Sequence, residues 1–272
     1  MFKERKAFRM ISLLFISIFA LTGCGGPGGA DVTAESTLQR VLQNKKVVVG
    51  VLPDFAPWGF VNSAGGLEGY DIDIANELGE ALGAEVELVA IEAPNRVPSL
   101  ASNKVDVIIA CLTPSNERAK SVEFTIPYAS AGLIPMVKAD NDSISSYEDL
   151  AGKTVAVVRG GMPEMGVRNM IPDANMMTFD TIADAYTAFK QGQAEVFVEE
   201  DTYVFMEVKN NSEYKAIGEP FSTELISMAV RQEDQQWMNY LNNFLTNLRF
   251  TGRNAELYEK WFGHEPKELI LP

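Results

Sequence analysis

The segment VVVGVLPDFAPWGFVNSAGGLEGYDIDIANELGEALG, residues 47–83, decides the fold of this 272-residue chain. It opens with an apolar run at 47–52, which is typical of a strand buried on both faces. After a loop, apolar residues recur at helical spacing from Ile74 to Leu82, with Asp71 as the expected cap and Gly83 as the end. The segment predicts a strand, a loop and a helix, and the loop after such a strand is a common ligand position.

Strands and helices continue to alternate along the rest of the chain, with no repeat. The expected strands are 85–91, 105–110, 132–137, 154–158, 195–198 and 227–230. The expected helices are 95–102, one from Asn116 capped by Ser115, 145–150, 181–191, 237–248 and 254–261. The pattern predicts an α/β fold with largely parallel sheets.

A polar break at 138–143 precedes a fresh set of elements, which indicates a second lobe. Residues 46–137 and 229–272 are predicted to form lobe 1, and residues 138–228 to form lobe 2. The chain would then cross between the lobes twice. Ligand sites favour such interfaces between domains.

Composition excludes several classes of function. The chain has 23 Lys and Arg residues against 37 Asp and Glu residues, and its net charge of -14 leaves no basic surface for nucleic acid. Its one histidine, His264, lies in a polar tail, which excludes catalytic triads and multi-histidine metal sites unless that tail folds back into a cleft. We therefore expect no nucleic-acid partner, no metal and no cofactor.

The first 23 residues have the order of regions typical of an export signal. Four cations precede an uncharged apolar run at 10–21, which is too short for an ordinary membrane-spanning helix. The run ends in Leu-Thr-Gly-Cys24, which resembles the bacterial lipobox, and a glycine-rich stretch suited to a tether follows. Residues 1–23 are predicted to be a signal peptide, and residues 24–45 a lipidated N-terminus and tether.

Cleavage before Cys24 would leave an acidic chain with a net charge near −17. With Cys24 acylated, Cys111 would be the one free cysteine, so no disulfide could form within the chain. We expect a monomer in the cell envelope, anchored by lipid to the membrane on its extracytoplasmic side.

Ordered motifs span residues 46–263. They are VGV at 49–51 with FAPWGF at 55–60, GYDIDIA at 69–75, NRVPSL at 95–100, KVDVIIA at 104–110, NERAK at 116–120, FTIPY at 124–128, DLAGK at 149–153 and YEKWFG at 258–263. In this order they resemble the polar amino-acid family of extracellular solute-binding proteins of ABC importers, family 3. The resemblance implies a two-lobed periplasmic-binding-protein type II fold, with a mostly parallel sheet flanked by helices in each lobe and two crossovers.

The resemblance also implies how the carboxylate of a free amino acid would be held. Arg118 would be its bidentate partner, helped by the hydroxyl and amide of Thr113. A turn at Gly161 and Met162 would add backbone N–H groups, although the family usually has smaller or hydroxylated residues there. Local sequence alone would instead favour a solvated charge for Arg118 and a purely structural glycine turn.

An acidic acceptor for the ligand ammonium is implied in lobe 2. Counting from Gly192 places Glu200 in that position, with Asp201 as the runner-up, and the carbonyl of Cys111 is expected to face the ligand. The acidic run at 199–201 is alternatively a solvated helix cap.

The ligand side chain is expected to meet residues from both lobes. Leu52 stands where an acid is often found, which disfavours a cationic side chain, and Ala93 leaves room. Arg96 could reach a side-chain carboxylate, or could instead cap its own helix or pair with Glu92. The residues expected around the side chain are Phe55, Trp58, Arg96 and Arg159.

Three classes of function follow. The first is a lipid-anchored protein without catalytic residues, which captures a polar amino acid, acidic or small, and delivers it to the membrane permease of an ABC importer. The second is an enzyme of the dehydratase type on the same fold, with Glu199 or Glu200 as general acid. The third is the ligand-sensing module of a receptor, which would need a following membrane span and signalling domain.

Overall fold

The computed structural model of the protein describes residues 36–267. The predicted signal peptide and Cys24 lie outside the described residues. Between residues 36 and 267, no helix combines the length and the apolar character that a membrane crossing requires.

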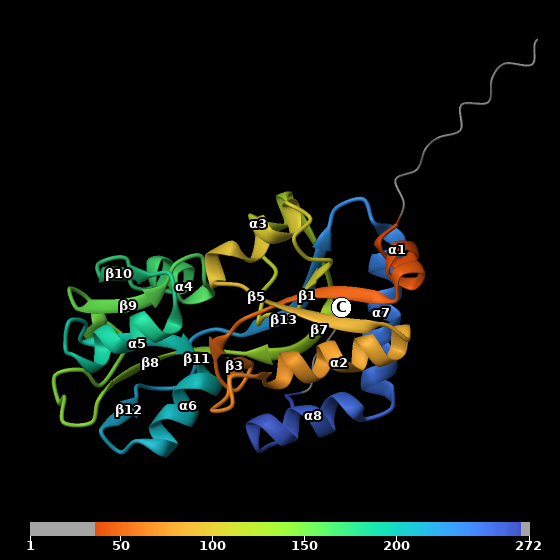
Figure 1. Ribbon diagram of the computed structural model, residues 1–272. Coiled ribbons are helices and arrows are strands. Elements are labelled where there is room, and N and C mark those ends of the chain that lie inside the picture. Colours follow the sequence, from red (N-terminus) through yellow and green to blue (C-terminus); the bar gives the residue numbers. More distant parts are fainter. Residues whose placement is uncertain (1–35, 268–272) are drawn as a thin grey trace, which may run out of the picture. The chain divides into compact units, whose positions relative to one another are not determined.

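One five-stranded sheet organises lobe 1, in the order β5-β1-β6-β13-β7 (Figure 1). Strand β1 runs parallel to β5 and β6, and β13 runs antiparallel to both β6 and β7. Four strands therefore point the same way, and β13 runs against them. The strands are β1 (Lys46–Val51), β5 (Glu85–Ala90), β6 (Val107–Ile108), β7 (Val122–Ala131) and β13 (Glu224–Arg231).

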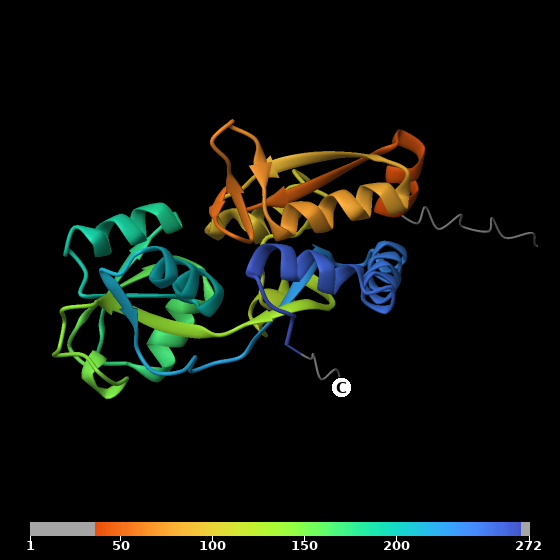
Figure 2. The same cartoon turned by 90° about the horizontal axis from the view of Figure 1, so that it is seen from below.

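Helices and a small three-stranded sheet complete lobe 1. Helices α2 (orange) and α8 (blue) lie side by side in both views (Figures 1 and 2). The helices are α1 (Thr37–Asn44), α2 (Tyr70–Leu82), α3 (Arg96–Ala101), α7 (Gln235–Phe250) and α8 (Arg253–Phe262), with 3-10 turns η1 (Ala93–Asn95) and η2 (Arg118–Lys120). The small sheet is β2 (Asp54–Phe55), β3 (Gly59–Val61) and β4 (Leu67–Glu68).

The second five-stranded sheet, in the order β10-β9-β11-β8-β12, organises lobe 2. It repeats the plan of the first, because four strands share a direction and β8 alone opposes them. The strands are β8 (Leu133–Lys138), β9 (Thr154–Val158), β10 (Asn175–Phe179), β11 (Val196–Glu200) and β12 (Tyr214–Ala216). The helices are α4 (Met162–Met170), α5 (Ile182–Lys190) and α6 (Asp201–Asn210), with the 3-10 turn η3 (Glu148–Leu150).

The predicted α/β fold is confirmed, but the lobe boundaries need correction. Strand β8 was assigned to lobe 1, yet it pairs with β11 and β12 in lobe 2. The polar break at 138–143 is a turn at the end of β8, and the first crossing lies at Gly132, inside an apolar stretch. The second crossing lies at 217–223, before β13 rather than after residue 228.

The two crossing segments approach each other closely at Gly132. A Cβ atom there would lie 2.5 Å from the Cβ of Pro220 and 2.8 Å from the Ser222 carbonyl oxygen. The Leu133 N–H donates to Ser222 Oγ at 3.1 Å, and the Phe221 N–H donates to the Leu133 carbonyl at 2.9 Å. Glycine is therefore required at this position, because a side chain would collide with the second crossing segment.

Asp71 does not cap α2, contrary to the expectation from its sequence position. Gly69 is the N-cap, and Asp71, the second residue of α2, is fully buried. Its carboxylate accepts hydrogen bonds from the Cys111 N–H at 2.9 Å and the Tyr128 hydroxyl at 2.6 Å. Burial raises the pKa of Asp71 to about 7, against the effect of these two donors. The side chain ties α2 to the loop after β6 and to β7.

The helices expected at 116 and 145 are each only a 3-10 turn, η2 and η3. Ser115 still acts as expected at the start of its turn, because its Oγ accepts the Arg118 N–H at 3.2 Å. Thr181 likewise caps α5 through the Asp184 N–H at 3.1 Å.

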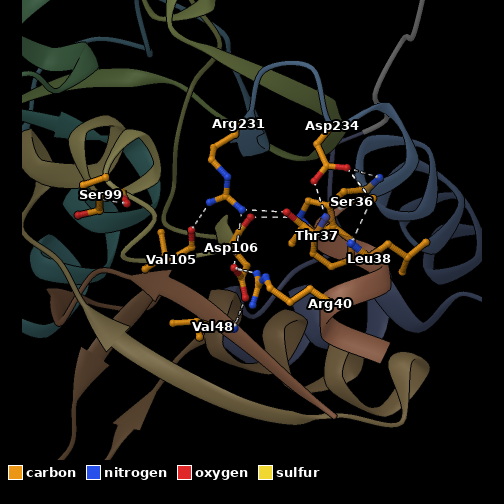
Figure 3. A network of polar contacts seen from close by, with 12 residues as sticks. Ser36, Thr37, Leu38, Arg40, Val48, Ser99, Val105, Asp106, Arg231 and Asp234 are labelled. Atoms are coloured by element: carbon orange, nitrogen blue, oxygen red, sulfur yellow. Dashed lines mark hydrogen bonds and ion pairs between the residues drawn. The ribbon is translucent and has the colours of Figure 1, made fainter. Parts of the chain in front are cut away.

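A polar network fastens α1 to the rest of lobe 1 (Figure 3). The buried carboxylate of Asp106 accepts the Val48 N–H at 3.0 Å, pairs with Arg40, and lies 3.8 Å from Arg231. Asp234, the N-cap of α7, accepts the Ser36 hydroxyl and the Thr37 N–H, each at 2.7 Å. Two carboxylates thus join segments nearly two hundred residues apart in the sequence.

We predict that Asp106→Ala lowers the free energy of unfolding by about 1–3 kcal/mol, because the Val48 N–H and two guanidinium groups lose a shared acceptor. Urea denaturation followed by circular dichroism measures the change. The control is Asp142→Ala, since Asp142 is exposed and 3.8 Å from Lys215, and it should change stability by less than about 0.5 kcal/mol. Equal losses in the two variants would contradict this account of Asp106.

Candidate functional site

A small enclosed cavity lies between the two lobes, at the ends of their strands. It has a volume of about 20 Å³, which is room for roughly one water molecule. An amino acid is larger, so the side chains or the lobes must move for one to enter. The lining residues are Leu52, Phe55, Ala93, Arg96, Cys111 and Arg118 from lobe 1, and Val158, Gly161, Met162, Pro163, Ile182, Glu199 and Glu200 from lobe 2.

Topology explains why these residues meet. Leu52 and Cys111 follow the carboxyl ends of β1 and β6, and Val158 and Glu200 stand at the carboxyl ends of β9 and β11. In a sheet of parallel strands these ends lie along one edge, where ligands commonly bind. Each lobe turns that edge toward the cavity.

Arg118 bridges the lobes. Its Nη1 donates to the Thr113 carbonyl at 2.5 Å, and its Nη2 donates to the Gly160 carbonyl of lobe 2 at 2.6 Å. Burial, with a further contribution from Arg96, lowers the pKa of Arg118 to about 9, so the guanidinium stays charged at neutral pH. The alternative of a freely solvated surface charge does not describe this half-buried group.

Thr113 lies beside Arg118 but does not line the cavity. Its side chain is buried, and its Oγ1 has no hydrogen-bond partner among the described residues. Gly161 and Met162 stand as N-cap and first residue of α4, which places backbone N–H groups and the positive end of that helix at the cavity.

Glu199 and Glu200 both reach the cavity from the end of β11. They are 3% and 4% exposed, and one carboxyl oxygen of each, Oε2, has no partner among the described residues. Burial raises the pKa of both groups, while the positive charge of Arg96 opposes the shift. A solvated cap at 199–201 is therefore wrong, since Asp201 is also buried, at 4% exposed.

Asp201 is not brought to this cavity. Its carboxylate pairs with Lys267 at 3.3 Å and lines a separate cavity together with Lys260 and Trp261. Its N–H donates to the Gly132 carbonyl at the first crossing. Of the two acids considered for the ligand ammonium, only Glu200 lines the cavity that Arg118 also lines.

Arg96 lines the cavity, but carbonyl groups already engage its guanidinium. Nε donates to the Ala93 carbonyl at 3.0 Å, and Nη1 donates to the carbonyls of Ala110 at 2.9 Å and Cys111 at 3.0 Å. No ion pair with Glu92 forms, because Glu92 accepts instead from Asn95 at 3.3 Å. Burial lowers the pKa of Arg96.

Cys111 is held in a strained backbone conformation. Its φ of 42° lies in the left-handed region, which favours glycine. Its N–H is bound by Asp71, and its carbonyl, which was expected to face a ligand, accepts from Arg96. Its Sγ lies 4.0 Å from Glu200 Oε1, and burial raises the pKa of the thiol well above its usual range.

Phe55 lines the cavity as expected, with its ring 5.5 Å from that of Tyr203 in lobe 2. Two other residues expected around a ligand side chain lie elsewhere. Trp58 is buried against Tyr70 and Phe262, and Arg159 is exposed and paired with Asp180 at 2.7 Å. In the sequence, an exposed arginine and a buried core tryptophan look the same as residues that contact a ligand. Sequence alone therefore could not exclude Arg159 and Trp58 from the site.

Asp54 is a functional candidate that sequence reasoning missed. Its Oδ2 accepts the N–H groups of Ile182 at 3.0 Å and Ala183 at 3.4 Å, so a carboxylate of lobe 1 binds the N-terminus of α5 in lobe 2. Burial raises its pKa. Its position in the loop after β1, where ligand sites are common, was the sequence signal that could have indicated a role. Its partner, however, lies 128 residues away.

Comparison with known proteins gives matches along most of the chain. Residues 47–264 match the family described as bacterial extracellular solute-binding proteins, family 3. The chain is 32% identical over 272 residues to the ABC transporter glutamine-binding protein GlnH of Bacillus subtilis, covering 96% of this chain and 99% of the relative. It is 27% identical over 250 residues to the L-cystine-binding protein TcyJ of Escherichia coli K12, covering 91% and 94%.

Solved structures share the fold. An ancestral arginine-binding protein bound to glutamine has a TM-score of 0.77 at 36% identity, covering 81% of this chain and 99% of its own. The solute receptor for L-cysteine of Neisseria gonorrhoeae has a TM-score of 0.79 at 28% identity, covering 84% and 93%. The ancestral amino acid-binding protein AncCDT-1, a precursor of cyclohexadienyl dehydratase, has a TM-score of 0.79 at 33% identity, covering 84% and 100%.

We predict that Asp54→Ala loosens the contact between the lobes. Loss of a carboxylate from the N-terminus of α5 removes about 1–2 kcal/mol from the arrangement with the lobes in contact. The equilibrium constant between that arrangement and one with the lobes apart then changes roughly tenfold. Small-angle X-ray scattering should show a larger radius of gyration. The control is Asp180→Ala, which removes an exposed carboxylate that pairs within lobe 2, and it should leave the scattering unchanged.

Proposed function

Because the chain belongs to family 3 of the bacterial extracellular solute-binding proteins, we propose that it captures one polar amino acid between its lobes and delivers it to the membrane permease of an ABC importer. The observation that carries the proposal is the pairing of opposite charges across one enclosed space: Arg118 enters from lobe 1 and Glu200 from lobe 2. A zwitterion transferred out of water needs both partners at once.

Arg118 is the proposed partner of the ligand carboxylate. In the structure its two terminal nitrogens donate to neutral carbonyls, one in each lobe. A carboxylate in their place would add an opposite charge and bidentate geometry, and such bonds are stronger than those to neutral carbonyls. The Met162 N–H, at the N-terminus of α4, would add a donor from lobe 2. The unpartnered Thr113 hydroxyl lies beside Arg118 outside the cavity and would join the proposed carboxylate site when side chains or lobes move to admit a ligand.

Glu200 is the proposed acceptor of the ligand ammonium. Its buried Oε2 lacks a partner among the described residues, and an incoming cation would supply one. Asp201 is the weaker candidate, because its carboxylate lies in another cavity beside Lys267.

An acidic or small polar side chain is proposed for the ligand. On the lobe 1 side Leu52, Phe55 and Ala93 present no acid to a cationic side chain. Arg96 and Arg118 supply two positive charges to the cavity, against the two acids Glu199 and Glu200 of lobe 2. The small polar class has further support, because three carbonyls already hold Arg96 and two similar proteins are named for glutamine and L-cysteine.

Anchoring by lipid at Cys24 is a further part of the proposal. It rests on the order of basic, apolar and glycine-rich segments around the lipobox-like Leu-Thr-Gly-Cys24. A protein tethered in this way would act as a monomer outside the cytoplasmic membrane, within reach of its permease.

A dehydratase-type enzyme is the second candidate. The observations that favour it are two buried acids with raised pKa in one cavity and the likeness to AncCDT-1, a dehydratase precursor. Among residues 36–267 the cavity brings no second general acid or base of another type and no nucleophile other than the buried Cys111 thiol. Binding without turnover is therefore the function that we propose.

A thermal-shift panel of the twenty amino acids tests the proposal. Acidic or small polar amino acids should raise the melting temperature, because a ligand at a hundred times its Kd adds about 2.7 kcal/mol to stability. Mass spectrometry of the same mixtures should show every amino acid unchanged. Stabilisation by none of them, or only by lysine, arginine or histidine, would count against the proposal.

We predict that Arg118→Ala weakens binding of the amino acid identified in that panel by two to four decades in Kd. The ligand carboxylate would lose its charged partner in a desolvated site, at a cost of roughly 3–5 kcal/mol. Calorimetric titration measures the loss. Lys120→Ala, in the same 3-10 turn but exposed and paired with Glu117, is the control and should bind as the unmodified protein does.

A further inference from the structure

Glu199 is a second buried acid that the proposed binding mode leaves without a role. One carboxylate, Glu200, suffices for a single ammonium group. Glu199 nevertheless lines the same cavity, is 3% exposed, and directs an unpartnered Oε2 into buried surroundings. A buried carboxyl in such a place must either be neutral or find a cation.

Ionisable groups approach Glu199 from every side of the cavity. Glu200 stands on the same strand and hydrogen-bonds its carboxyl group, while Arg96 faces it from α3 and Asp54 from β2. Tyr203 of α6 and Cys111 after β6 also lie within range of its charge. Burial and the neighbouring acids raise the pKa of Glu199 well above its usual range, and only Arg96 opposes them.

The charge of the cavity lining then depends on the hydrogen-bonded pair of Glu199 and Glu200, because burial raises the pKa of both, and that of Glu199 well above its usual range. Arg96 and Arg118 contribute two positive charges. When the pair holds one proton, on Glu199, the lining carries a net +1, and when the pair holds none the lining carries no net charge. An enclosed site of low dielectric constant strongly favours a ligand that makes the sum zero.

We propose that the protonation state of Glu199 selects the net charge of the ligand, so that the protonated form favours an anionic amino acid and the ionised form favours a neutral one. The inference rests on the proposed function. A protonated Glu199 can donate a hydrogen bond to a side-chain carboxylate or carbonyl oxygen. An ionised Glu199 repels that carboxylate and accepts a hydrogen bond from a side-chain amide or hydroxyl.

Glutamate and glutamine are the matched probes, since they differ in charge but hardly in shape. Neither side chain titrates between pH 5.5 and pH 8.5, because the glutamate carboxyl has an ordinary pKa of about 4.3. Arg118 also stays charged through most of that range, with its pKa of about 9. A change in their relative affinity inside this window therefore reports on the protein.

Calorimetric titrations of the full chain with both probes at pH 5.5, 7.0 and 8.5 test the inference. The ratio of glutamine affinity to glutamate affinity should rise at least tenfold from the lowest pH to the highest. In Glu199→Gln, whose amide imitates the protonated acid, the rise of the ratio with pH should be much smaller and the ratio should favour glutamate. Any rise that remains reports on other groups, such as Asp71 with its pKa of about 7. Glu195→Gln is the control, because Glu195 is exposed and pairs with Lys153 before β11.

If Glu199→Gln does not fold, the titrations of the unmodified protein test the inference by themselves. The inference would be overturned if the affinity ratio did not change with pH, both for glutamine against glutamate and for asparagine against aspartate. Binding of these amino acids would still support the proposed function. An unchanged pH dependence in Glu199→Gln would also overturn it. If none of the twenty amino acids binds at any pH, the proposed function fails and the inference fails with it.

Discussion

The cost of burying charge between the two lobes is the constraint on which the rest of the structure depends. Arg96, Arg118, Glu199 and Glu200 share one space with room for about one water molecule. A charged group in such a place needs hydrogen bonds or an opposite charge. Carbonyls of both lobes serve the two arginines, and the two glutamates share a hydrogen bond. Five carbonyl oxygens thus do for the two guanidinium groups what solvent does elsewhere, those of Ala93, Ala110, Cys111, Thr113 and Gly160.

The two lobes meet through directional polar contacts as well as apolar ones. Arg118 reaches Gly160, the Asp54 carboxylate binds the N-terminus of α5, and the Trp58 indole N–H donates to Thr202 Oγ1 at 2.9 Å. Such contacts can be exchanged for contacts to a ligand with little loss, whereas the packed apolar faces within each lobe cannot. An arrangement of this kind suits a protein whose task is to enclose a small solute and release it again.

Unusual backbone positions support the same site. Cys111 keeps a φ of 42° because Asp71 holds its N–H and Arg96 holds its carbonyl. The Asp71 carboxylate in turn is fixed by Tyr128 on β7. Helix α2, strand β7 and helix α3 are therefore coupled to the cavity through one residue, and strain at Cys111 is sustained by the packing around it.

Much of the fold and part of the site could be predicted from sequence. Apolar runs and helical spacing located β1, α2, α5 and α7 within a few residues, because those patterns depend only on which faces are buried. Family-like motifs selected Arg118, Glu200 and Phe55, all of which line the cavity.

Sequence placed the first crossing at the polar break after β8, but the chain crosses at Gly132. The close approach of Pro220, rather than local polarity, decides the position of that crossing. Only the tertiary structure showed that Glu200 lines the cavity between the lobes whereas Asp201 lines another. It also showed that Arg159 and Trp58 lie away from the cavity and that Asp54 binds the N-terminus of α5. Each of these positions depends on partners that are distant in the sequence.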